Sequence, residues 1–410
     1  FPDGVVYLSA RHQPLADLLQ FVFDAFYESD VPFKPTDTQL RHALQGKRAL
    51  VMPDDVELSW DEIQALMDAA PGCTFLLAAS ERHLYGEGRA VLLRGLPTED
   101  ALALVERELG RPLTPQERPD AQSLCTTLEG HPLRLLQAAA LVREKGMTIA
   151  QVASRVTPPF QSKGKQSGPF PDVELTKQVL ATLDEPERRV VATLAALNGA
   201  PVGADHVSAL SGLADAASIL ESLLRRGLTQ AHSPRYTLAG TLDWDVRQAW
   251  DLTPWAQRAL AHFATWAEGH RSTPDRLLEE ADAILQVLAW GAGAGRWTQV
   301  LRLGRAVEGA LALGRRWGAW RRVLNLLLRA ARALGDRAAE AWVYHQLGTR
   351  ALCLGETATA RTSLVQALRM RRTLGDQAGA TVTHHNLSIL LGPPTPPRRP
   401  PSQPAPTPAP

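Results

Sequence analysis

The sequence lacks every short motif that would place it at once in a common enzyme class. Its 410 residues contain no Gly-x-x-x-x-Gly-Lys-Ser/Thr phosphate loop, no Gly-x-Ser-x-Gly elbow, no His-Glu-x-x-His helix and no Gly-x-Gly-x-x-Gly fingerprint. The nearest approach to a phosphate loop is Gly164-Lys165-Gln166-Ser167, which has Pro159 where the first glycine belongs and follows no strand. The usual hydrolase, metalloprotease and dinucleotide sites are therefore excluded.

Cysteine, long apolar runs and an excess of charge are also scarce. Cys73, Cys125 and Cys353 are odd in number and too far apart for a zinc knuckle, which favours a reducing, cytoplasmic setting. No run of about 18 apolar residues and no basic-then-apolar leader occurs, so we expect neither a membrane span nor a signal peptide. The formal net charge of +1 gives no overall attraction to nucleic acid or to an anionic membrane.

The first 97 residues alternate between apolar strands and amphipathic helices. Helices are expected over residues 15–26 and after Ser59, where Glu62 completes a capping box. The apolar runs are short and uniform, as in strands that are covered on both faces of a parallel sheet. We expect these strands at residues 4–10, 49–52, 74–79 and 90–93. The pattern predicts an α/β layer fold.

Helical patterns follow from Thr98, which we expect to cap the first of three helices at residues 98–109, 115–128 and 132–145. They predict a small helical subdomain over residues 98–157, followed by a Pro/Gly/Ser-rich linker at 158–172. A winged-helix domain is expected over residues 173–243, from helical stretches at 173–183, 185–197, 206–210 and 216–226 and a short hairpin around 227–228 and 236–238.

An internal repeat marks residues 244–392. Leu334-Gly335-Asp336 recurs as Leu374-Gly375-Asp376, a period of 40 residues that is typical of tetratricopeptide-like helix pairs. Such pairs stack into a solenoid with an extended binding surface. Trp317, Trp320 and Trp342 have helical spacing and are expected to pack between helices. Residues 393–410 are Pro-rich and predict a disordered tail.

One pair of acids stands out in this background. Asp54 and Asp55 directly follow an apolar strand, which is a common arrangement for holding a hydrated Mg²⁺ in a phosphate-handling site. The companion phosphate loop is the motif that the sequence lacks.

Four segments together resemble the signal-transduction ATPases with numerous domains, in particular the NB-ARC type, over roughly residues 4 to 390. They are the strand ending in Asp54-Asp55, the strand ending in Ser80-Glu81-Arg82, the segment Arg94 to Ala101, and Gly130-His131-Pro132-Leu133. The resemblance implies that Asp54 orients Mg²⁺ through water, that Asp55 positions the attacking water, and that Arg82 reads the terminal phosphate. It also implies that the Gly130–Leu133 segment places its proline against the adenine of ATP or ADP.

The sequence also departs from that family. The resemblance implies that residues 1–97 are an N-terminally truncated domain with an incomplete parallel P-loop NTPase sheet that lacks its Walker A loop. We expect an upstream segment to complete this sheet. Pro53 removes an N–H from the acidic strand, and Ala239 stands where the family usually has a phosphate-sensing histidine. We therefore expect no hydrolysis by this chain alone, and weak or absent binding of ATP or ADP with Mg²⁺.

Three hypotheses follow. The first is a regulatory nucleotide switch whose helical repeats bind a protein partner, with self-association on activation. The second is a non-catalytic interaction scaffold with a vestigial nucleotide site. The third is a fragment of a transcriptional regulator of the same class.

Two arginine groups bear on the partner. Arg225-Arg226 ends a predicted helix. Such a pair more commonly marks a solvated helix end than a contact with DNA. We therefore expect no nucleic-acid partner. Arg361, Arg369, Arg371 and Arg372 are consistent with an acidic partner, although a solvated basic face is the more common reading.

Overall fold

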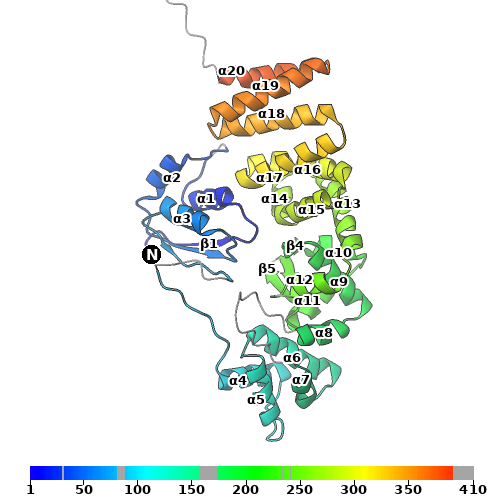
Figure 1. The fold of residues 1–410 in the computed structure, drawn as a ribbon. Coiled ribbons are helices and arrows are strands. Elements are labelled where there is room, and N and C mark those ends of the chain that lie inside the picture. The colour runs from blue at the N-terminus through cyan, green and yellow to red at the C-terminus, as the bar shows by residue number, and fades with distance from the viewer. Residues whose placement is uncertain (30–31, 81–87, 157–172, 233, 241, 391–410) are drawn as a thin grey trace, which may run out of the picture. The chain divides into compact units, whose positions relative to one another are not determined.

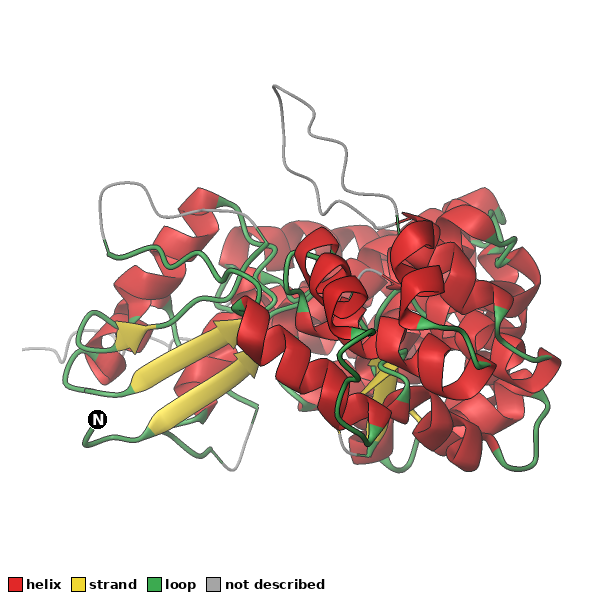
Figure 2. Ribbon diagram, turned by 90° about the horizontal axis from the view of Figure 1, so that it is seen from below, coloured by secondary structure: helices red, strands yellow, loops and turns green. Residues whose placement is uncertain are grey.

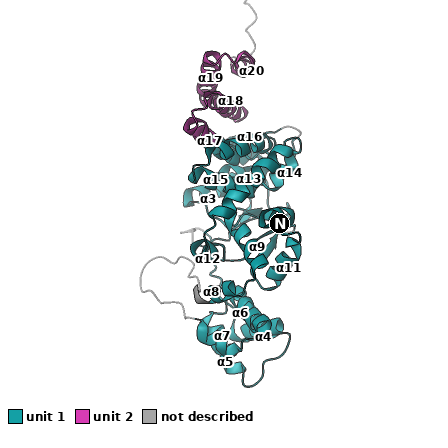
Figure 3. Cartoon of the chain, turned by 90° about the vertical axis from the view of Figure 1, so that its right-hand side faces the viewer, with its two compact units in different colours: residues 1–326 teal, residues 327–410 magenta. Residues whose placement is uncertain are grey.

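A computed structural model describes residues 1–29, 32–80, 88–156, 173–232, 234–240 and 242–390. The chain forms two compact units, residues 1–326 and residues 327–410, which Figure 3 shows in different colours. Arg82, the expected linker at residues 158–172 and the Pro-rich tail at 393–410 lie outside the described residues. Helices predominate, with two three-stranded sheets (Figure 1). The expected mixture of small sheets and helical repeats is confirmed.

The first sheet is parallel and lies near the N-terminus. Its strands are in the order β1-β2-β3 and are drawn as yellow arrows at the left of Figure 2. Their bounds are β1 Val5–Ser9, β2 Leu50–Asp54 and β3 Thr74–Phe75. Val5 is paired with Leu50 at one end of the β1–β2 ladder and Ser9 with Asp54 at the other. Whether this sheet is part of a P-loop NTPase stays a prediction.

The third strand is shorter than the predicted run at residues 74–79, and Pro53 explains why. In the observed register, the carbonyl of Val51 accepts from the N–H of Leu76 and the carbonyl of Pro53 accepts from the N–H of Ala78. Residue 53 would also donate an N–H to the carbonyl of Leu76, but proline has none. The chain therefore stays beside β2 as far as Ala78, yet regular pairing ends at Phe75.

The predicted strand at residues 90–93 is wrong. These residues form neither helix nor strand, and Val91, Leu92 and Leu93 are 68%, 81% and 90% exposed. A strand needs a neighbour with which to pair its N–H and C=O groups, and no sheet of the described chain includes this segment. The β-rich composition of this segment is not sufficient by itself to form a strand.

Helices cover one face of the parallel sheet. The core beneath them includes Leu8, Val51, Leu18 and Ile63. The other face is open in the structure, where Val5, Tyr7 and Leu76 are 61%, 62% and 56% exposed, so the expectation of strands covered on both faces is wrong. The covering helices are α1 Leu15–Asp24, α2 Asp37–Leu44 and α3 Trp60–Ala69 (Figure 1).

Helix α2 was missed in the sequence, although it carries a signal. The side chain of Thr36 accepts the N–H of Gln39, and the Gln39 side chain accepts the N–H of Thr36. The same reciprocal capping box joins Ser59 and Glu62 before α3, as predicted.

Four helices follow between residues 98 and 155. They are α4 Thr98–Leu109, α5 Arg118–Thr127, α6 Pro132–Lys145 and α7 Ile149–Arg155. Helix α6 has its predicted bounds, because Pro132 suits a first helical position and Gly146 ends the helix with a left-handed φ of 63°. Thr98 does not cap α4: it is the first helical residue and Pro97 stands at the cap position, with no side-chain hydrogen bond.

The next part combines helices with a small antiparallel sheet in the order β4-β6-β5. Its helices are α8 Val173–Ala181, α9 Glu185–Ala196, α10 Ala204–Ser211, α11 Ala216–Arg225 and α12 Leu242–Ala249. Its strands are β4 Val202–Gly203, β5 Thr229–His232 and β6 Arg235–Leu238. Helices α8 to α11 and the β5–β6 hairpin lie close to where the sequence placed them, whereas β4 and α12 were not predicted. The winged-helix interpretation stays a prediction.

The rest of the described chain, as far as residue 390, is mainly helical. Its helices are α13 Thr253–Gly269, α14 Pro274–Glu279, α15 Ala281–Gly293, α16 Trp297–Leu313, α17 Trp317–Ala333, α18 Arg337–Cys353, α19 Thr357–Thr373 and α20 Gln377–Ile389. Across the described ranges, no single helix has the length and apolar character to cross a membrane; only α10 and α11 meet that test jointly, with a 110° bend between them.

The 40-residue repeat has a local cause in unit 2. Gly335 and Gly375 have left-handed φ values of 66° and 74°, which end α17 and α19. Asp336 and Asp376 then accept the N–H groups of Ala339 and Gly379 and cap the following helices. The Leu-Gly-Asp triplet therefore stops one helix and starts the next.

Close packing of α18 against α19 depends on Gly348. A Cβ added there would lie 2.5 Å from Cγ of Leu364, whereas a Cβ added at Gly309 in α16 meets nothing within 4 Å. We expect Gly348→Ala to lower the free energy of unfolding by about 1–3 kcal/mol through overpacking. Gly309→Ala should instead raise it by about 0.5–1 kcal/mol through helix propensity.

Urea denaturation followed by circular dichroism measures both effects. Equal stability of the two variants would contradict the close approach of α18 and α19.

Candidate functional site

The predicted acids lie at the carboxyl ends of the parallel strands, where open α/β sheets usually bind ligands. The Asp54 carboxylate is held on both oxygens: the Tyr7 hydroxyl donates to Oδ2 at 2.8 Å, and the N–H of Asp55 donates to Oδ1 at 3.0 Å. The Asp55 carboxylate lies 3.7 Å from Nε of Arg11. Both predicted acids therefore have partners within the chain.

Further residues from the loop after β1 extend this site. Nδ1 of His12 lies 2.8 Å from Oε2 of Glu57, and Nε2 lies 3.1 Å from the carbonyl oxygen of Asn198. Both partner atoms are acceptors, so a neutral imidazole satisfies only one of them. The His12 ring thus connects the sheet to the turn after α9.

The site continues into α12 through Arg247. Arg247 donates to the Asn198 side chain and lies 3.3 Å from Oδ2 of Asp243. Asp243 is 3% exposed, and its Oδ1 has no hydrogen-bond partner in the described part of the chain. Burial raises the pKa of Asp243, while the charges of Arg247, Arg11 and His12 oppose that rise. We call the whole group the Asp54 cluster: Tyr7, Arg11, His12, Asp54, Asp55, Glu57, Asn198, Asp243 and Arg247.

Backbone strain is concentrated in the Asp54 cluster. His12, Asp55 and Asn198 have φ values of 58°, 58° and 54°, and they are three of the five non-glycine residues with positive φ in the described chain. Such conformations cost about 1–3 kcal/mol each and persist only where surrounding contacts enforce them. Here the strained residues are those that join the sheet to the α9–α12 part. The cluster is therefore a constrained junction between two parts of unit 1.

The second predicted motif forms a separate group. Gly130 has a φ of 66°, and its carbonyl accepts the N–H of Leu96 at 2.8 Å. His131 is the cap residue and Pro132 the first residue of α6. Leu133 packs against Gly240, just before α12, because a Cβ added at Gly240 would lie 2.6 Å from its Cδ2. Between described residues, no hydrogen bond or ion pair joins Gly130–Leu133 to Asp54 or Asp55, and Ala239, beside Gly240, is fully buried.

A second junction, which the sequence did not reveal, lies between α1 and α17. Asp17 has no exposed surface, and its carboxylate accepts the N–H groups of Gly318 at 2.6 Å and Ala319 at 2.9 Å. Trp317 donates its indole N–H to Oε1 of Gln20 at 2.9 Å. We call these residues the α1–α17 contact: Asp17, Gln20, Trp317, Gly318 and Ala319.

The chemistry of the α1–α17 contact is that of a helix cap supplied from a distant part of the chain. The first N–H groups of a helix have no partner within it and attract a negative charge. Burial raises the pKa of Asp17, while the charge of Arg316 and the two backbone N–H groups oppose that rise. Gly318 permits the approach, since a Cβ there would lie 2.5 Å from Cβ of Pro14. An acid at the start of an amphipathic helix was the only sequence signal, and it is too common to be informative.

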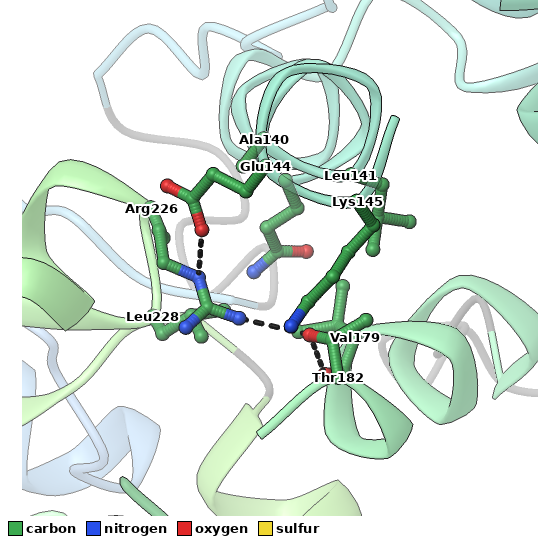
Figure 4. Close-up of a pocket in the computed structure, with 9 residues that line it drawn as sticks. Ala140, Leu141, Glu144, Lys145, Val179, Thr182, Arg226 and Leu228 are labelled. Atoms are coloured by element: carbon green, nitrogen blue, oxygen red, sulfur yellow. Dashed lines mark hydrogen bonds and ion pairs between the residues drawn. The ribbon is translucent and has the colours of Figure 1, made fainter. Parts of the chain in front are cut away.

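Two arginines expected at the surface are buried. Arg226 is 5% exposed and contacts Glu144 at 3.0 Å and Thr182 at 2.8 Å (Figure 4). It also lies 2.7 Å from Glu187. Because these partners hold its guanidinium, Arg226 is not available to DNA phosphates. Arg371 is 7% exposed and donates to the carbonyl of Gly379 and to Thr383, so it does not belong to a solvated basic face.

The cavity beside Arg226 is small. Gln137, Leu141, Val179 and Leu228 are among its lining residues (Figure 4). Its volume of about 10 Å³ is enough for roughly one water molecule. It cannot hold a nucleotide.

The residues of the Asp54 cluster do not fit a nucleotide. Two adjacent carboxylates suit a hydrated Mg²⁺, but a triphosphate also needs backbone N–H donors and a lysine from a Gly-rich loop. Four acids (Asp54, Asp55, Glu57 and Asp243) outnumber the two arginines, which are themselves paired with Asp55 and Asp243. Such a cluster repels phosphate.

The phenol of Tyr7 reports on Asp54. Its hydrogen bond to Asp54 raises the pKa of Tyr7, with smaller contributions from burial and from the charges of Asp54 and Asp55. We expect Asp54→Asn to lower that pKa toward the ordinary value of about 10. Asp55→Asn should lower it much less, because Asp55 is the weakest contributor. Ultraviolet titration, with Tyr7→Phe used to identify the signal, measures both shifts; equal shifts would contradict the geometry.

Comparisons with known proteins give similarity to solved structures alone. No family model matches the chain, and no curated protein matches it in sequence. Among solved structures, it is similar to a signal transduction ATPase with numerous domains from Pyrococcus horikoshii that has a tetratricopeptide repeat sensor. The TM-score is 0.40 and the identity 13%, over 95% of this chain and 77% of that chain. At these values the similarity supports no conclusion about the fold or function of this chain.

Proposed function

We propose that this chain is the regulatory core of a signal-transduction protein. In this proposal the α/β layer is held against the first turn of α17 by the α1–α17 contact. A protein partner that binds the helical repeats breaks this contact. The observation that carries the proposal is the buried carboxylate of Asp17 on the N–H groups of Gly318 and Ala319.

The α1–α17 contact has the energetics of a switch. A buried carboxylate is costly to desolvate, and its hydrogen bonds and Arg316 offset that cost only while the geometry holds. When the two parts separate, water solvates the carboxylate and the helix N–H groups again. Closed and open states therefore differ by a modest free energy, and a partner that favours the open state shifts the population.

Nucleotide hydrolysis is not part of the proposal for this chain. The acids of the Asp54 cluster are held by Tyr7 and Arg11, and the sequence supplies no phosphate loop. The cluster's role in this proposal is to join the sheet to α9 and α12, so that these parts move together.

We expect millimolar Mg-ATP or Mg-ADP to leave the melting temperature unchanged and to release no phosphate. Bound ligand at 100 times its Kd would add about 2.7 kcal/mol of stability, so binding would be visible in a thermal scan. A rise in melting temperature that disappears in Asp54→Asn would contradict this expectation.

The switch itself is tested at Asp17. We expect Asp17→Ala to speed amide hydrogen exchange of Gly318 and Ala319 by roughly tenfold to a hundredfold, because each buried N–H without a partner costs about 1–3 kcal/mol. Exchange within α3 and α18 should not change. Mass spectrometry after proteolysis resolves these segments.

Asp68→Ala is the control outside the contact. Asp68 is an exposed residue of α3 and accepts a hydrogen bond from Gln64 of the same helix at 2.9 Å, so its loss should leave exchange of Gly318 and Ala319 unchanged. Unchanged exchange in Asp17→Ala would contradict the switch and support the alternative of a rigid interaction scaffold. Faster exchange in every helix would mean global unfolding, and would also contradict the proposed local release.

A further inference from the structure

Helix α19 is basic throughout and has no acid to balance it. Its 17 residues include four arginines and neither Asp nor Glu. Arg371 is buried, but Arg361, Arg369 and Arg372 are exposed, as is Val365 at 43%. Their spacing of four, four and three residues places them along one side of the helix. We call these residues the α19 stripe: Arg361, Val365, Arg369 and Arg372.

The three arginines of the α19 stripe make no ion pair with any described residue. Three other arginines of unit 2 have acidic partners: Arg332 and Arg337 lie 3.0 Å and 2.6 Å from the Glu340 carboxylate, and Arg371 lies 3.6 Å from Asp376. The α19 stripe thus presents unpaired guanidinium groups to solvent.

Helix stability explains only part of the stripe. Arg372 lies in the last turn of α19, where the helix dipole favours a cation. Arg361 is the fifth residue of the helix and gains nothing from the dipole. Arg369 and Arg372 are three residues apart, and like charges at this spacing repel.

The same arrangement occurs one repeat earlier in the sequence. Subtracting the period of 40 from 361, 369 and 372 gives Arg321, Arg329 and Arg332, all in α17. Helix α17 also contains neither Asp nor Glu. The repeat therefore specifies arginine at these positions, as it specifies the Leu-Gly-Asp cap.

We propose that the α19 stripe binds an acidic helical segment of a protein partner. This names the partner chemistry of the repeats and so rests on the proposed function. Arg361 and Arg369 are eight residues apart, or about 12 Å along the axis, which a parallel acidic helix matches with carboxylates two turns apart. Each guanidinium can bind a carboxylate through two N–H groups. Val365 lies between them and offers an apolar contact, which a phosphate backbone would not use.

The probe is a fluorescein-labelled helical peptide with Glu at every fourth position and Leu between the acids. We expect it to bind the wild-type chain and to lose at least tenfold in affinity to a triple variant, Arg361→Glu, Arg369→Glu and Arg372→Glu. Val365→Ala should weaken binding severalfold, and a peptide with Gln for Glu should not bind. Fluorescence anisotropy at two salt concentrations measures these affinities.

Arg337→Glu is the matched control, since the Arg337 side chain is 64% exposed on the neighbouring helix α18 but is paired with Glu340. It should leave peptide affinity unchanged, and circular dichroism should show all variants folded. Equal loss in Arg337→Glu would mean nonspecific charge attraction and would overturn the proposal. So would tighter binding of duplex DNA or of phosphatidylserine vesicles that does not depend on Val365.

This result and the Asp17 result are separable. Peptide binding with unchanged exchange in Asp17→Ala supports the acidic partner and contradicts the switch. If the peptide does not bind but Asp17→Ala accelerates exchange at Gly318 and Ala319, the acidic partner is overturned and the switch stays supported.

Discussion

The carboxylate of Asp17 must be hydrogen-bonded because no water reaches it. A buried charge without partners would cost more than a small domain can offset. Its partners are the N–H groups of Gly318 and Ala319, which lie 301 and 302 residues away in the sequence. This single requirement fixes where α1 meets α17, and Gln20, Trp317 and Pro14 pack around it.

The two predicted acids of the Asp54 cluster are not under this constraint, because Asp54 is half-buried and Asp55 is exposed. These acids lie at the carboxyl ends of strands, a position that in many α/β proteins binds a ligand. In this chain Tyr7 and Arg11 satisfy them, and His12 and Arg247 extend the network to Asn198. The network resembles a ligand site in its position and a structural junction in its contacts, and its internal pairing favours the junction.

Local signals in the sequence predicted most helices. Pro132 and Gly146 bound α6, and the Leu-Gly-Asp triplets bound the repeats, because caps and stops act within one turn of the chain. The strand predicted at residues 90–93 was wrong because a strand depends on a partner that its own composition does not supply. The packing of Leu133 against Gly240 was not predicted, since it joins residues that are distant in the sequence.

By itself the sequence determined many of the helices, the 40-residue repeat and the absence of a phosphate loop, all of which depend on neighbouring residues alone. Only the tertiary structure decided which charges are buried and which remain exposed. Arg371 and Arg372 are adjacent and chemically identical, yet one is held by Thr383 and Gly379 and the other faces solvent. The free energy of a charge depends on its desolvation and its partners, and residues distant in the sequence supply both.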